Sequence, residues 1–209
     1  AAAGDASAIR IAAAVAALEA ALLRSQPQIV EELAARGRPL REQWEARGPG
    51  VMRAVQRFTE DDVVPRTAEV VLVGPYAGGG GLAHLKSNRV LLEAVLFNPL
   101  PELPEVLRLA WFLVQLNGDL PRYAECLPMQ RSARMIQLAM LPPVLAAAEV
   151  VELATFDESL VTTALGAWGL ANGDATAMAQ TLLHWWSAFD NRATRWPAAL
   201  AALDAMLSP

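Results

Sequence analysis

The sequence predicts a mainly α (α+β) fold, with about eight to ten short helices and a small two- or three-stranded β element around residues 63–97. Two observations support this fold class. The chain is rich in alanine and leucine and poor in β-branched residues, a composition that favours closely packed helices. β-branched residues instead gather at 63–64 and 69–73, just before a run of four glycines.

The N-terminal region is predicted to be helical over residues 7–36, because apolar side chains recur there at helical spacing. This apolar stripe consists of Ile11, Val15, Leu18 and Leu22. Ser25-Gln26-Pro27 is expected to divide the region into two helices, with the proline near the start of the second. Gly37 and Pro39 are expected to end that second helix.

Two more helices are predicted at 39–46 and 51–58, separated by a break at Gly48-Pro49-Gly50. The strand predicted at 69–73 follows. The apolar run at 90–97 suits either a strand or a helix, and its place between a glycine loop and Asn98-Pro99 favours a strand. The expected β element is a small sheet, such as a hairpin with a long loop, packed against the helices.

The C-terminal half is predicted to be helical again, with each new helix beginning at a proline or a capping residue. Pro142-Pro143 marks a kink or a new start, Thr155 or Asp157 caps one helix, and Asp174 caps another. The short loops predict antiparallel neighbours. The expected helices cover residues 104–117, 121–126, 128–141, 142–153, 155–172, 174–190 and 197–207.

The chain is predicted to form one globular domain over residues 1–209, because no long linker, repeat or low-complexity segment interrupts it. A subdivision is conceivable. It would comprise N-terminal helices at 1–60, a small β element with the glycine-rich loop at 61–100, and a helical bundle at 101–209.

Composition argues against several classes of function. The net charge is −5 and the arginines are scattered, so a nucleic-acid surface is not expected. Cys126 is the only cysteine, which rules out an internal disulfide and a cysteine-based zinc site within one chain. No membrane association is expected, because charges or prolines interrupt the longest apolar stretches, 103–116 and 135–151. A cytoplasmic location is favoured, and a signal segment removed before residue 1 stays open.

The run Gly78-Gly79-Gly80-Gly81 is the most informative motif. Its backbone N–H groups could cradle an anion, with help from nearby polar and cationic side chains. The alternative is a flexible connection, because the spacing of neither a P-loop nor a dinucleotide-binding motif is present. The candidate ligand-binding residues are Gly79, Gly80, Gly81, His84, Lys86 and Arg89.

No catalytic residue, metal ligand or cofactor is predicted. The H-E-x-x-H and G-x-S-x-G motifs are absent, and Ser87 near His84 has no evident third partner. Glu149 and Glu152 are expected to share a helix face, where they could act as acid and base or simply be solvated. Two strands followed by a helix is also the order before the zinc helix of many metallopeptidases, but the helix over 107–115 has no ligand.

Tryptophan is concentrated near the C-terminus, where Trp185 and Trp186 are adjacent on a predicted helix. Neighbouring helical positions point about 100° apart, so the two indoles are not expected to face the same core. Packing within the core is the plain interpretation. A surface for a partner is the alternative, and Trp185 and Trp186 are its candidate residues.

The sequence favours a helical interaction or scaffold protein that binds a protein partner or self-associates, without evident catalysis. Two alternatives remain open. The chain could be a small-molecule or anion-binding domain that uses the Gly78–Gly81 loop, or an inactive relative of a hydrolase-type fold that lacks its metal ligands.

Overall fold

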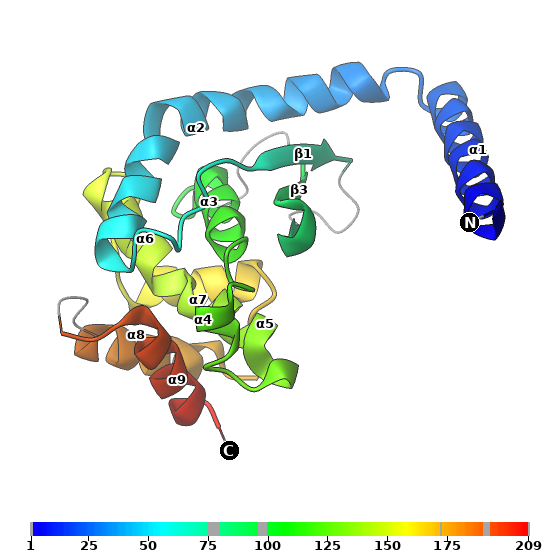
Figure 1. Cartoon of the computed structure of the whole chain (residues 1–209). Helices are drawn as coiled ribbons and strands as arrows, with labels where there is room; N and C mark the ends of the chain where they lie inside the picture. The colour runs from blue at the N-terminus through cyan, green and yellow to red at the C-terminus, as the bar shows by residue number, and fades with distance from the viewer. Residues whose placement is uncertain (1, 75–79, 96–99, 172, 190–192, 209) are drawn as a thin grey trace.

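The structure is a computed structural model that describes residues 2–74, 80–95, 100–171, 173–189 and 193–208 (Figure 1). Helices dominate, and a three-stranded sheet is the only β structure within these ranges, so the predicted fold class is confirmed. The helices are α1 Ala2–Ser25, α2 Ile29–Phe58, α3 Glu105–Gln115, α4 Pro121–Ala124, α5 Met129–Ala139, α6 Leu141–Val150, α7 Glu158–Ala167, α8 Ala175–Ala188 and α9 Trp196–Met206. The strands are β1 Glu69–Val73, β2 Gly81–His84 and β3 Arg89–Glu93, with a 3₁₀ turn at Leu85–Ser87.

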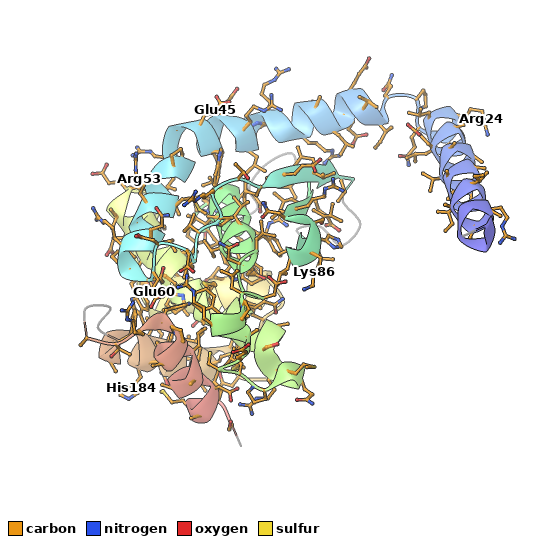
Figure 2. All side chains as sticks on the ribbon, in the orientation of Figure 1. Arg24, Glu45, Arg53, Glu60, Lys86 and His184 are labelled. Atoms are coloured by element: carbon orange, nitrogen blue, oxygen red, sulfur yellow. The ribbon has the colours of Figure 1, made fainter. Side chains whose placement is uncertain are left out.

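The N-terminal break falls where it was predicted, since α1 ends at Ser25 and α2 begins at Ile29. The predicted end of the second helix at Gly37-Pro39 and the predicted break between the next two helices at Gly48-Pro49-Gly50 are wrong, because α2 continues through both. Instead α2 bends: Glu45 lies on its upper arm and Arg53 on its descending arm (Figure 2). A helix that contains proline more often bends than runs straight.

The glycines of α2 serve close packing rather than helix termination. A Cβ at Gly37 would lie 2.3 Å from a methyl carbon of Leu72 on β1, and a Cβ at Gly50 would lie 2.9 Å from Val151. Glycine therefore lets α2 approach both the sheet and the end of α6. The sequence signal was ambiguous because the same residue type also ends helices.

The sheet has the strand order β1-β3-β2, with β3 in the centre. β3 pairs parallel with β1 and antiparallel with β2. The expected hairpin between 69–73 and 90–97 is therefore wrong. The chain reverses direction between β1 and β2 and again at the 3₁₀ turn, so β3 runs parallel to β1. The β element starts at 69 rather than around 63, since the buried Val63 and Val64 lie in a turn. Strand is the correct choice for 89–93, and residues 96–99 lie outside the described residues.

The C-terminal helices begin at the predicted prolines and caps. Pro104 precedes α3, Pro128 precedes α5, and Pro142-Pro143 occupy the first turn of α6. The side chain of Asp157 accepts a hydrogen bond from the N–H of Leu160, and Asp174 accepts from Thr176 and Ala177. These contacts satisfy N–H groups that a helix start leaves without a partner.

The core is one connected cluster of apolar side chains from α2 to α9, and α3 lies at its centre. Every residue of α3 from Val106 to Gln115 is buried, because α2, α5, α6 and the sheet all pack around it. The described side chains of α1 contribute nothing to this core, and α1 stands away from the remainder of the molecule (Figure 1). The division of the chain into domains stays a prediction.

Tyr123 on α4 connects the segment after α2 to the helical half of the molecule. Its hydroxyl is buried and donates a 2.5 Å hydrogen bond to Asp62, and the amide of Asn117 donates to the carbonyl of Asp62 at 2.7 Å. Burial raises the pKa of Tyr123 to about 12, against a weaker opposing effect of Arg122.

We expect the free energy of unfolding to fall between pH 10 and about 12, because the unfolded tyrosine ionises in this range while the folded one keeps its proton. The loss at the upper end should be about 2–3 kcal/mol. Urea unfolding at a series of pH values measures it. Tyr123→Phe should flatten this part of the profile, and an unchanged slope in that variant would contradict the assignment.

Candidate functional site

The described end of the glycine loop, Gly80 and Gly81, lies against the sheet and α3. Gly78 and Gly79 lie outside the described residues. The N–H of Gly80 donates to the Glu93 carboxylate at 3.0 Å, and the N–H of Glu93 donates to the Gly80 carbonyl at 3.1 Å. A Cβ at Gly81 would lie 2.5 Å from the ring of Phe112, so close packing requires glycine there.

Arg108 of α3 is buried beneath this loop end and is 2% exposed. Its Nη1 donates to the Gly80 carbonyl at 2.5 Å, and its Nη2 donates to the Glu93 carbonyl at 3.1 Å. Its Nε and Nη2 also donate to the carboxylate of Glu105, one turn earlier on α3. The guanidinium is therefore neutralised from within the chain. The arrangement suits a structural clamp better than a site for a free anion.

A cleft of about 230 Å³ opens beside Arg108. The indoles of Trp111 and Trp168 are stacked, with ring centroids 5.0 Å apart. The indole N–H of Trp111 already donates to the Gln137 carbonyl at 2.9 Å, so it is engaged within the chain. Its lining residues are Gly80, Gly81, Arg108, Trp111, Phe112, Gln137, Trp168, Gly169 and Leu170.

The other predicted ligand-binding residues have different surroundings from this cleft, whose described lining includes none of them. His84 is exposed at the end of β2. Lys86 lies in the 3₁₀ turn and forms an ion pair with Asp119 at 3.1 Å. Arg89 donates to Glu69 of β1 with an Nε–Oε2 distance of 2.9 Å. The structure thus places Gly80 and Gly81 together but gives the two cations carboxylate partners elsewhere. A shared ligand site stays a prediction.

Trp185 and Trp186 of α8 contact each other and both contact Phe189, and each also has a further neighbour of its own within the chain. Trp185 is buried and donates to the Ala199 carbonyl of α9 at 2.8 Å. Trp186 is half-buried and meets Phe58 of α2 edge-on, with centroids 6.1 Å apart. Their use as an interaction surface stays a prediction. Of the two indoles, only that of Trp186 is exposed enough for a partner to contact.

The carboxylates that the sequence groups together are separated. Glu149 is on α6 and accepts a hydrogen bond from the N–H of Phe156 at 3.0 Å. Glu152 follows the end of α6 with a φ of 57°, so the expectation that it shares a helix face with Glu149 is wrong. The end of α6 at Val150 is not visible in the sequence pattern, because Val151 and Leu153 continue its apolar character.

The side chains with nucleophilic potential are engaged with the backbone. Ser87 donates to the carbonyl of His84, not to its imidazole, at 3.4 Å. The thiol of Cys126 donates to the Tyr123 carbonyl at 2.9 Å, and burial raises the pKa of this thiol. A raised pKa disfavours the reactive thiolate at neutral pH. No group of three or more histidine, cysteine, aspartate or glutamate side chains among the described residues could hold a metal ion.

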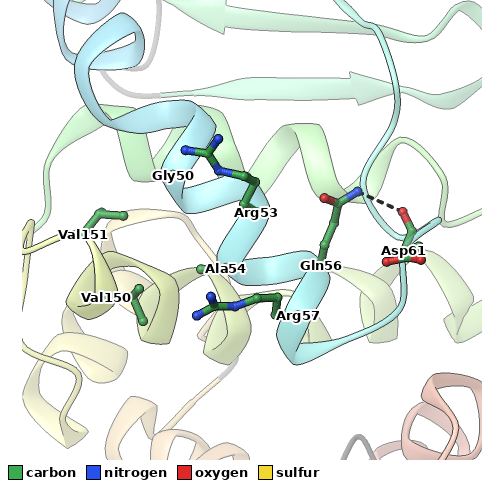
Figure 3. A pocket seen from close by; sticks show the side chains of 8 residues that line it. All are labelled: Gly50, Arg53, Ala54, Gln56, Arg57, Asp61, Val150 and Val151. Carbon is green, nitrogen blue, oxygen red and sulfur yellow. Dashed lines mark hydrogen bonds between the residues drawn. The ribbon is translucent and has the colours of Figure 1, made fainter.

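A second cleft, of about 410 Å³, lies between α2 and the end of α6 (Figure 3). Arg53 and Arg57, one turn apart on α2, border it, and Val150 and Val151 form its other wall. The amide of Gln56 donates to the Asp61 carbonyl at 3.1 Å. Cationic side chains beside the C-terminus of a helix are explained by its dipole, so this cleft needs no ligand to account for its arginines.

α1 exposes more large apolar side chains than any other described helix or strand. Two described segments, Ala6–Ser25 and Met129–Val150, are long and apolar enough to cross a membrane by length and composition. In Met129–Val150, 72% of the window is buried inside the protein, whereas in Ala6–Ser25 the figure is 0%. The large apolar side chains that α1 exposes are Ile9, Ile11, Val15, Leu18, Leu22 and Leu23.

Comparisons with known proteins add no family. A scan against protein-family models, a search of curated proteins and a search of solved structures each returned no match for this chain. The geometry of the described residues is therefore the basis for any functional proposal.

Replacing Arg108 with alanine should lower the free energy of unfolding by about 3–5 kcal/mol, because it leaves the partly buried carboxylate of Glu105 and the Gly80 and Glu93 carbonyls without their buried donor. Lys86→Ala is the matched control. Its ion pair with Asp119 is solvent-exposed, so its loss should be within about 0.5 kcal/mol. Chemical denaturation of both variants measures the difference. A loss below about 1 kcal/mol for Arg108→Ala would contradict the role of a structural clamp.

Proposed function

We propose that this chain is a helical interaction protein that binds a protein partner through α1. The observation that supports this proposal is the complete exposure of α1, none of whose apolar window is buried against the rest of the molecule. Elsewhere in the described portion of the chain, the buried cation Arg108 is paired with Glu105, and Asp157 and Asp174 cap the starts of α7 and α8.

The exposed apolar side chains of α1 provide the driving force for binding. Ile11, Val15 and Leu18 are 63%, 57% and 70% exposed. Fully burying one large aliphatic side chain gains about 1.5–3 kcal/mol. A contiguous apolar surface on a soluble protein usually marks an interaction site. A helix whose apolar stripe has no partner within its own chain therefore favours a partner from outside it.

The charges on α1 argue against a membrane as that partner. If Ala6–Ser25 spanned a bilayer, Glu19 would lie about 5 Å and Arg10 about 8 Å from the midplane, from the helical rise per residue. Each central charge costs about 2.5–3.5 kcal/mol, whereas each large aliphatic residue gains only about 0.3–0.6 kcal/mol. With so many alanines, the exposed aliphatic residues of α1 do not offset two such charges.

A position flat on a membrane surface fits no better. At about 100° per residue, Arg10 and Arg24 point only about 40° apart, but Glu19 points about 140–180° away from them, beside the apolar stripe. An interfacial helix instead gathers its charges on one broad polar face. A narrow apolar stripe with Glu19 beside it suits the surface of another helix.

The two alternative functions have less support. For an anion-binding domain, the candidate cations Lys86 and Arg89 are held by Asp119 and Glu69, and Arg108 is held by Glu105. For an inactive hydrolase relative, Glu152 lies beyond the end of α6, and neither Glu149 nor Glu152 is among the residues that line the two clefts described above. Neither alternative explains why α1 is exposed.

Site-specific photo-crosslinking tests the proposal. A diazirine analogue of leucine is placed at Leu18 on the apolar stripe or, as a matched control, at Ala13 on the opposite side of α1. In an extract of the cells that naturally make the protein, we expect a discrete protein adduct from position 18 and little from position 13. Adducts to lipid alone, or equal protein labelling from both positions, would contradict the proposal.

A further inference from the structure

Resting on the proposed function, we propose that the partner of α1 is a second copy of this chain, and that two α1 helices pack along their apolar stripes as a coiled coil. The proposal depends on the spacing of the apolar side chains, on the placement of the charges around them and on the separation of α1 from the rest of the molecule.

The apolar stripe of α1 has the spacing of a coiled-coil seam. Ile11, Val15, Leu18 and Leu22 follow one another at intervals of four, three and four residues. This alternation places Val15 and Leu22 at the a positions of a heptad and Ile11 and Leu18 at the d positions. Projected at about 100° per residue, these four side chains fall within a sector of about 60°, whereas Ile9 and Leu23, both at b positions, lie outside it. An apolar sector this narrow suits one facing helix better than a broad core surface.

The charges of α1 leave this seam clear. Arg10 and Arg24 occupy c positions of the same heptad, so a partner helix would leave both in solvent. The positions that flank the seam hold Ala12, Ala14 and Ala21, with Glu19 as the only charge next to the large apolar residues. Flanking charges normally decide which different helix a coiled coil accepts. Alanine at these positions has no charge that would favour a different helix, and its small side chain lets two identical helices approach closely.

The placement of α1 keeps the seam accessible to a second copy. Figure 1 shows α1 joined to the upper arm of α2 and separated from the helices around α3. Arg24 lies at the end of α1 next to α2, so the rest of α1 extends beyond the point of attachment (Figure 2). Two copies related by a twofold axis bury the same seam from both chains at once, which is the commonest form of protein self-association.

Sedimentation equilibrium of the whole chain tests the proposal over a wide range of protein concentration. The monomer mass is 22.4 kDa, and we expect the wild-type mass to rise with concentration towards twice that value. Leu18→Lys places a charge in the seam and should raise the dimer dissociation constant at least about tenfold. Ala13→Lys adds the same charge at the f position opposite the seam, and should change this constant less than about threefold.

The two variants should unfold at the same denaturant concentration as the wild type under monomeric conditions, because α1 is not buried against the core. A wild-type protein that stays at 22.4 kDa throughout would overturn self-association. Equal weakening by Ala13→Lys and Leu18→Lys would overturn the seam. A monomeric wild type that still gives a protein adduct of another mass from position 18 would overturn this inference alone. Lipid adducts alone from position 18 would overturn the proposed function as well.

Discussion

The buried guanidinium of Arg108 is the interaction on which the central packing depends. It holds the Gly80 and Glu93 carbonyls and the Glu105 carboxylate, and so joins the glycine loop, β3 and α3 through one side chain. A lone buried charge would cost several kcal/mol, so this cation can lie inside only because the carboxylate and both carbonyls surround it. The position of the loop end and that of the central helix are therefore fixed together.

The contacts of Arg108 also change how the glycine run is interpreted. Glycine at position 81 lets Phe112 of α3 lie against the start of β2, and the backbone of Gly80 pairs with Glu93 while accepting from Arg108. The N–H and carbonyl of Gly80 are thus both engaged within the chain. The described part of the loop behaves as a packing element, and the cleft beside it has an aromatic wall rather than a cluster of cations.

The sequence predicted the class of the fold and the starts of the C-terminal helices, because proline and aspartate act locally at helix N-termini through their fixed φ and their side-chain oxygens. The helix ends predicted within α2 were wrong, because Gly37 and Gly50 leave room for Leu72 and Val151, which are distant in the sequence. The parallel pairing of β1 with β3 likewise depends on strand order, which local patterns do not encode. Arg108 lay in a predicted helix, yet its burial becomes visible only when Gly80 and Glu93 are brought beside it.

The apolar stripe of α1 presents the opposite case, because the sequence showed the stripe but not its exposure. Periodicity alone cannot distinguish a helix that packs on its own core from one that packs on another molecule. The distinction comes from the rest of the chain, whose core is already complete around α3 without any contribution from α1. The proposed binding surface is therefore the helix whose large apolar side chains stay exposed while the core forms without them. The upper arm of α2, whose Gly37 packs on β1, fixes one end of that helix while leaving its apolar stripe free to meet another.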